Sequence, residues 1–199
     1  MLRLERRFMV AALVVTPLLA GWAINSSLDL QPNSQLWVDG TSNVRDFKCS
    51  AKTMEADIAT TRVDAAAALN TGEKAITTVA FRIPAAQLDC KNGQMNEHMR
   101  KAIKAGASPM IAFELKTYDL LSTSGKMRAK LAGNLSLGGV TKPITVDATL
   151  IQETAGGVRV MGVYSLKMTD FGLKPPSLMM NTMKVQDVVK VNFDLVLKN

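Results

Sequence analysis

The sequence predicts an all-β, antiparallel fold with one short helix inserted midway. Hydrophobic residues alternate with polar ones along about nine separate runs, and glycine-rich corners separate several neighbouring runs. The hydrophobic period changes to that of a helix near residue 96. Antiparallel strands in such number bury one face either by closing into a barrel or by stacking as a sandwich.

The clearest strand pair is a hairpin over residues 131–150, in which two alternating runs flank a glycine-rich corner. Gly138 and Gly139 allow the chain to reverse, and Pro143 marks the expected start of the second strand. The residues expected on the buried face lie two positions apart: Leu131, Gly133, Leu135 and Leu137, then Ile144, Val146, Ala148 and Leu150.

The remaining elements are predicted in chain order from the same signals. Residues 64–68 are rich in alanine and are expected to be a loop with at most one helical turn. The helix begins at Asn96 as its N-cap, carries Met99, Ala102 and Ile103 on one face, and ends at Gly106. Strands are expected over residues 36–42, 43–51, 54–60, 75–84, 110–121, 127–137, 144–152, 158–167 and 185–198.

The N-terminus has the pattern of a secretory signal peptide over residues 1–23. Three arginines precede an apolar run from Phe8 to Ala20, and small residues precede a cleavage site after Ala23. An uncleaved signal anchor is the alternative. We therefore expect an exported protein, periplasmic or secreted, without a stable membrane span after cleavage. Residues 24–35 are predicted to be a linker, and residues 36–199 the folded domain.

Charge and cysteine content narrow the function classes further. The net charge is +7, or +5 without residues 1–23, and the charges are scattered without interleaved aromatics, so a nucleic-acid partner is not expected. The two cysteines, Cys49 and Cys90, are expected to form a disulfide in an exported chain. Two buried thiols, or a metal or redox site, are the alternatives. With one histidine and no Cys-x-x-Cys, no metal site is expected.

Several short sequence segments, taken in order, resemble the YceI-like family of exported lipid-binding proteins. They are the hairpin over residues 133–144, the helix entry at 95–99 followed by the strand entry at 108–113, Asp170-Phe171-Gly172, and the closing strand at 185–197. The resemblance implies an extended, lipocalin-like antiparallel β-barrel of about eight strands. It also implies that the lumen holds an isoprenoid-type lipid or quinone, with no catalytic residue and no cofactor beyond that ligand.

Lumen residues follow from the alternation of the strands. Small inward candidates, such as Ala56, Ala148 and Gly162, leave room inside the barrel. The aromatic and aliphatic wall is expected to include Phe81, Phe113, Leu135 and Val146. His98 is a candidate for contact with a lipid head group, because the family places a histidine here; a structural hydrogen bond at the barrel end is the alternative.

Residues 168–183 are too rich in proline for a continued strand and too apolar for a surface loop that only connects two strands. Methionine adapts to irregular apolar partners. We expect a flap at one mouth of the barrel, and a permanently packed plug is the alternative. The residues proposed for it are Phe171, Leu173, Leu178, Met179 and Met180.

The function expected from these observations is non-catalytic carriage or sequestration of an amphiphilic lipid, and a homodimer is compatible with it. A second hypothesis is a structural or interaction module of the cell envelope whose barrel is filled with its own side chains. An enzyme is a third, which no carboxylate pair, nucleophile elbow or metal cluster in the sequence supports.

Overall fold

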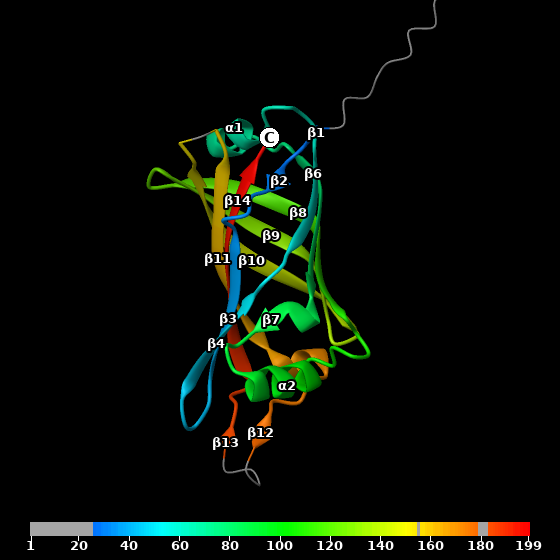
Figure 1. Ribbon diagram of the computed structural model, residues 1–199. Coiled ribbons are helices and arrows are strands. Elements are labelled where there is room, and N and C mark those ends of the chain that lie inside the picture. The colour runs from blue at the N-terminus through cyan, green and yellow to red at the C-terminus, as the bar shows by residue number, and fades with distance from the viewer. Residues whose placement is uncertain (1–25, 155, 179–182) are drawn as a thin grey trace, which may run out of the picture.

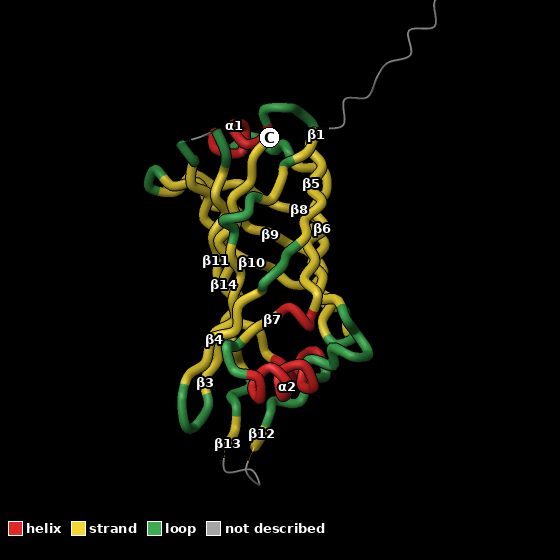
Figure 2. The backbone as a smooth tube through the Cα atoms, viewed as in Figure 1, coloured by secondary structure: helices red, strands yellow, loops and turns green. Residues whose placement is uncertain are grey.

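A computed structural model describes residues 26–154, 156–178 and 183–199 of the 199-residue chain. The fold is mostly β: twelve antiparallel strands form one strongly curled sheet, with a short helix at each of its ends (Figure 1). The path through the sheet is β1-β5-β6-β8-β9-β10-β11-β14-β3-β4-β7, and β2 pairs with β14. The backbone trace shows the same curled wall around an interior (Figure 2).

The strands of this sheet are β1 (Ser26–Ser27), β2 (Asp29–Leu30), β3 (Gln35–Thr41), β4 (Asp46–Ala51), β5 (Glu55–Thr60), β6 (Ile76–Pro84), β7 (Leu88–Asp89), β8 (Met110–Thr123), β9 (Lys126–Leu137), β10 (Val140–Gln152), β11 (Val158–Lys167) and β14 (Val188–Lys198). A separate two-stranded sheet joins β12 (Ser177–Leu178) to β13 (Met183–Lys184). The nine expected strands correspond to the nine longer strands, with ends that differ by a few residues.

Two short α-helices are present, so the prediction of a single helix midway was wrong. The first, α1 (Ala65–Thr71), lies where a loop was expected. Its alanines and Leu69 are buried, and Gly72 ends it in the left-handed conformation. Burial of this small apolar face against the sheet stabilises a helix too short to form alone. We call the end of the sheet that α1 covers the α1 end.

The second helix, α2 (Gly93–Ala102), covers the opposite end, which we call the α2 end (Figure 1). It begins one turn earlier than predicted: Asn92 is the N-cap, and its side chain accepts a hydrogen bond from the Met95 amide at 2.9 Å. Asn96, the predicted cap, instead accepts from the Cys90 amide and donates to Asp89. Both asparagines carry the capping side chain, so only the path of the preceding chain decides between them.

The β9–β10 hairpin confirms the predicted inward face, but its second strand starts earlier than expected. Leu137 pairs with Val140 across a two-residue turn in which Gly138 and Gly139 have φ of 58° and 84°. Pro143 lies inside β10 rather than at its start. It is tolerated because β11 pairs with β10 only from Ala148 onward, which leaves the strand around Pro143 paired on one side.

Residues 26–35, predicted as a linker, belong largely to the folded structure. Ser26 pairs with Thr60 of β5, and Leu30 pairs with Leu197 of β14, so this short segment joins two strands of the wall at the α1 end. Leu28 is 1% exposed between them. Two apolar residues in a polar stretch carry too little periodicity to be detected in the sequence.

Residues 1–25, which include the predicted signal peptide, lie outside the described residues. Within the described part of the chain, no helix has the length and apolar character needed to cross a membrane.

Candidate functional site

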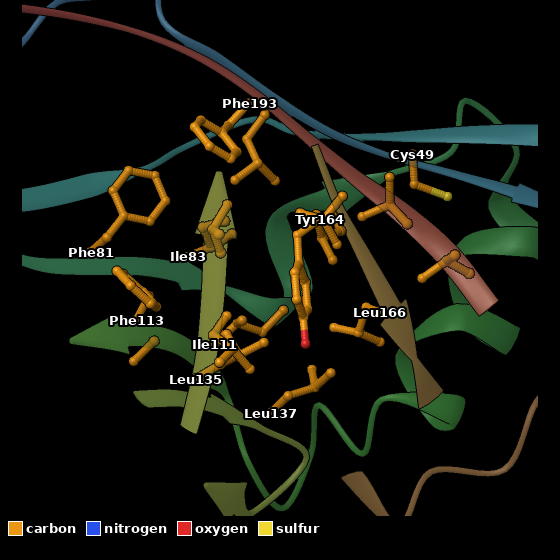
Figure 3. A pocket seen from close by; sticks show the side chains of 18 of the residues that line it. Cys49, Phe81, Ile83, Ile111, Phe113, Leu135, Leu137, Tyr164, Leu166 and Phe193 are labelled. Atoms are coloured by element: carbon orange, nitrogen blue, oxygen red, sulfur yellow. The ribbon is translucent and has the colours of Figure 1, made fainter. Parts of the chain in front are cut away.

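A cavity of about 680 Å³ lies inside the curled sheet and extends from α1 to α2. Figure 3 shows side chains from part of its wall. Its wall is almost entirely apolar and is contributed by nearly every long strand. Leu69 of α1 lines it at one end, and Met99 and Ile103 line it at the other. A cavity of this size and composition matches the space that small-molecule ligand sites occupy in proteins, and an apolar cavity holds an apolar guest in preference to water.

Three phenylalanine rings lie against glycines on neighbouring strands of this wall. A Cβ atom at Gly40, Gly133 or Gly162 would come within 3.0 Å of the ring of Phe47, Phe113 or Phe193, respectively. All three rings line the cavity. Each glycine therefore gives a large aromatic side chain room to lie flat on the sheet, so the rings build the wall without filling the interior.

Two tyrosine hydroxyls contribute polar atoms to the wall. The Tyr118 oxygen, near the α1 end, accepts a hydrogen bond from the Ile76 amide at 2.9 Å. Tyr164 stands between Ile111 and Leu166 in Figure 3, with its hydroxyl directed toward Leu137. Loss of hydration in this apolar setting, and then the nearby charge of Asp170, raise the pKa of Tyr164 above its usual value. Tyr164 is therefore a neutral phenol at physiological pH.

The two ends of the cavity differ in their exposure to solvent. At the α1 end the lining residues Ile58, Leu69 and Leu150 are 7%, 4% and 6% exposed. At the α2 end Asn92 and Gln94 line the cavity and are exposed. The cavity therefore communicates with solvent at the α2 end, and α2 lies across this mouth with no fully buried residue of its own.

Two attachments hold α2 in this place. Cys49 of β4 and Cys90, which precedes α2, form a disulfide, as the cysteine content predicted. The Asp89 carboxylate accepts hydrogen bonds from the Asn96 side chain at 2.8 Å and the Lys91 amide at 3.0 Å, and its other oxygen lies 3.1 Å from Lys52. These contacts, the one from Asn96 foremost, lower the pKa of Asp89 to about 2.

Most of the predicted binding residues lie on the cavity wall. Phe81, Phe113, Leu135 and Val146 line it from four different strands, and Leu173 and His98 line it near the α2 end. Phe171 is 2% exposed and packs in an adjacent apolar cluster with Leu137, Leu166 and Val189. Met179 and Met180, with the side chain of Leu178, lie outside the described residues.

Other wall residues were not singled out from the sequence. Phe47 and Phe193 face glycines on adjacent strands, a relation that depends on strand register. Tyr164 alternates with exposed residues of β11, so its inward direction was readable, but its place in the cavity was not. Met99 was recognised as part of the helix face, and only the tertiary structure places that face over the mouth.

The described residues contain no cluster of three histidine, cysteine or acidic side chains that could hold a metal ion. Both cysteines are in the disulfide. The wall of the site is an apolar enclosure with polar groups at both ends: the Tyr118 hydroxyl near α1, and Asn92, Gln94 and His98 near α2.

Comparison with known proteins agrees with this architecture. Residues 34–197 match the family model described as a YceI-like domain. A UPF0312 protein of Pseudomonas aeruginosa is 33% identical over 94 residues, which cover 44% of this chain and 47% of the relative. A UPF0312 protein of Azotobacter vinelandii is 31% identical over 103 residues, covering 48% and 52%. The chain thus spans about half the length of these curated relatives.

Solved structures share the fold at low sequence identity. BcnA of Burkholderia cenocepacia matches with a TM-score of 0.65 and 20% identity, covering 84% of this chain and 99% of that one. A polyisoprenoid binding domain from Saccharophagus degradans, implicated in plant cell wall breakdown, matches with a TM-score of 0.60 and 12% identity, covering 86% and 97%. A YceI protein of Campylobacter jejuni matches with a TM-score of 0.55 and 16% identity, covering 96% and 91%.

Proposed function

Because the chain belongs to the family of YceI-like domains, and because its sheet encloses an apolar cavity, we propose that it binds the tail of an isoprenoid-type lipid or quinone. In this proposal the curled sheet acts as an extended, lipocalin-like barrel that carries or sequesters the lipid without chemical conversion. The observation that carries the proposal is the apolar cavity of about 680 Å³. The polyisoprenoid binding domain with the same fold supports the choice of lipid class.

The binding energy in this proposal comes from burying the tail. Each methylene transferred from water contributes about 0.8 kcal/mol, so about ten such groups contribute about 8 kcal/mol before the entropy of immobilisation is subtracted. No specific polar contact is needed for affinity of this size. This explains why a hydrophobic carrier leaves few sequence motifs beyond the alternation of its strands.

In this proposal the polar part of the ligand lies at the α2 end. His98, Asn92 and Gln94 line the mouth, and the Tyr164 hydroxyl offers a neutral hydrogen-bonding group further inside. At the α1 end the wall is buried and the Tyr118 hydroxyl is already engaged by the Ile76 amide. We therefore expect the tail to enter first and the head group to stay near α2.

The disulfide supports an oxidising location, in the periplasm or outside the cell, for the protein that acts in this way. The other expected reading, an interaction module with a side-chain-filled barrel, is less favoured because the interior holds a cavity.

The proposal is tested by lipid uptake with a matched pair of substitutions on one strand. Ala56 of β5 lines the cavity, whereas Ala59 of the same strand is exposed on the outer face. We expect Ala56→Trp to weaken binding of a polyprenol and of a long-tailed quinone at least about tenfold, a loss of about 1.4 kcal/mol. Ala59→Trp should bind as the unmodified protein does. Native mass spectrometry measures lipid uptake by both variants. Displacement of a fluorescent lipid analogue, whose signal does not depend on protein tryptophan, gives their relative affinities.

Thermal unfolding of the two variants provides the control for misfolding. If Ala56→Trp remains folded and takes up both lipids as well as Ala59→Trp does, the cavity is not the binding site. If the unmodified protein takes up neither lipid and carries no hydrophobic mass when purified from its source, the carrier function is wrong.

A further inference from the structure

The helix α2 presents two chemically different faces. Its inner face contributes Met95, His98 and Met99 to the cavity wall. Its outer face and the turn that follows carry Arg100, Lys101 and Lys104, all exposed, which border a shallow depression on the outside of the molecule. A helix that is apolar toward the protein's interior and cationic toward solvent therefore lies across the mouth of the cavity.

The cationic surface continues onto neighbouring segments of the same end. The Lys184 amide donates to the Asn43 side chain at 2.8 Å, which brings β13 beside the β3–β4 turn. Exposed Arg45 follows this turn, and Lys174 lies in the loop between η2 (Met168–Phe171) and β12. These exposed cations thus come from segments far apart in the sequence, which Figure 1 shows together at the α2 end.

Most of these cations have no carboxylate partner among the described residues. Lys101 pairs with Glu97 at 2.6 Å, but Arg100, Lys104 and Lys174 are within 4.0 Å of no acidic oxygen in the described ranges. The cations that flank α1 differ in this respect: Arg62 pairs with Asp64 and Glu73, and Lys74 pairs with Asp119. On β9, near the same end, exposed cations without an acidic partner in the described ranges lie on the strand and not beside the helix. The positive charge around the mouth is therefore available to an external anion.

An exposed apolar side chain accompanies this charge. Val44, in the β3–β4 turn at the α2 end, is 61% exposed and directly precedes Arg45. Cationic side chains attract anionic lipid head groups, and an apolar side chain beside them adds contact with the acyl boundary of the bilayer. The scattered sequence positions of these cations, without interleaved aromatics, do not match a nucleic-acid surface.

We propose that the α2 end docks on the surface of an anionic phospholipid bilayer. The outer face of α2 and the β3–β4 turn contact the head groups, so the mouth of the cavity faces the bilayer from which a lipid enters or to which it returns. This inference rests on the proposed lipid-carrier function and adds where the ligand is exchanged. Each Lys or Arg close to an anionic surface strengthens binding about fivefold.

The test is cosedimentation of the protein with large vesicles of phosphatidylglycerol and phosphatidylcholine in equal parts. Vesicles of phosphatidylcholine alone are the neutral comparison. The test variant is Arg100→Gln/Lys101→Gln/Lys104→Gln, which neutralises the outer face of α2. The matched control is Lys126→Gln/Arg128→Gln/Lys130→Gln, which removes the same charge from exposed positions of β9 near the α1 end. Uptake of a polyprenol without vesicles is measured for all three proteins.

We expect the unmodified protein and the β9 control to bind the anionic vesicles, and the α2 variant to bind about 100-fold more weakly. Binding should disappear in about 1 M salt, where the Debye length falls to about 3 Å. Val44→Ser should weaken binding by the same factor at each salt concentration where binding is measurable, because its contribution is not electrostatic.

Equal binding of the α2 variant and the β9 control overturns the proposal, as does binding to neutral vesicles of the same strength. No vesicle binding at all also overturns it, and retention on heparin in that case indicates an acidic macromolecule as the partner instead. In each of these outcomes, unchanged polyprenol uptake leaves the lipid-carrier function standing, whereas loss of uptake in the unmodified protein removes both proposals.

Discussion

The two ends of the curled sheet are each covered by a short helix, but the two helices differ in how many of their side chains are buried and in how they are attached to the sheet. At the α1 end, Ala65, Ala66, Ala68 and Leu69 are buried, and Leu28 closes the wall beside them. At the α2 end, the helix has no buried residue and is attached by a disulfide and a carboxylate network. Its Arg100, and Lys104 in the turn that follows, pair with no acidic side chain in the described part of the chain. One helix is part of the core, and the other is a cover held by its attachments.

A short helix can therefore close one end of a cavity as part of the core, or lie across an open end with little buried surface. Which of the two occurs depends on how much apolar area its side chains bury. Small alanines let α1 sit close to the sheet and add to the apolar core. The longer side chains of α2 face a cavity that is partly open to solvent, so the helix gains little from burial. The following substitutions separate the two cases.

Removal of the disulfide should have the largest effect and should act on the α2 end. Cys49→Ser/Cys90→Ser opens a loop between positions 41 residues apart, which is worth about 4 kcal/mol in the chain-entropy model. In hydrogen-exchange measurements, the amides of α2 should lose more protection than the lower global stability explains. The amides of α1 should lose no more than that. Denaturant unfolding measures the total loss. Equal loss of protection at both ends would contradict the difference drawn between them.

Truncation of Leu28 should have the next largest effect and should act through the α1 end. Leu28→Ala removes a side chain that is 1% exposed, at an expected cost of about 3 kcal/mol in unfolding free energy. Met99→Ala, in the half-buried face of α2, should cost less than about 1 kcal/mol. Thermal and denaturant unfolding compare the two variants directly. A larger loss for Met99→Ala would show that α2 is a core helix after all.

Acidification should loosen α2 selectively through Asp89. Its folded-state pKa is about 2, below the usual 3.8, so its contribution to stability is present above about pH 4 and is lost as the pH falls toward 2. Amide exchange in α2 should therefore accelerate over this range. Asp89→Asn should remove this pH dependence while leaving the disulfide in place. An unchanged pH profile in that variant would show that another carboxylate is responsible.

The smallest expected effect on stability comes from Tyr164→Phe. The hydroxyl has no hydrogen-bond partner among the described residues, so its removal should change the unfolding free energy by less than about 1 kcal/mol. Spectroscopic titration of the unmodified protein should place its ionisation above the usual value of 10.0. Weaker binding of a quinone than of a plain polyprenol to Tyr164→Phe would identify the hydroxyl as a ligand contact; equal loss for both would argue against that role.

The sequence predicted the wall of this protein well and its ends poorly. Alternation identified the long strands and the inward face of β9 and β10, because each strand reports its buried face locally. The interior positions of Phe81, Phe113, Leu135 and Val146 follow from the same rule. The segment at 26–30 and the helix α1 were missed, because their structure depends on burial against strands distant in the sequence.

By itself, the sequence determined an antiparallel sheet with one apolar face, a hairpin at Gly138-Gly139, and two cysteines available for pairing. The sequence left a hollow and a filled interior as alternatives, and only the tertiary structure shows a cavity and its opening at α2 instead of at α1. The physical reason is that side-chain periodicity fixes which face is buried, whereas the volume left inside depends on curvature and register. In this protein, strand register places phenylalanine rings over glycines on adjacent strands, so these rings lie along the wall of the cavity.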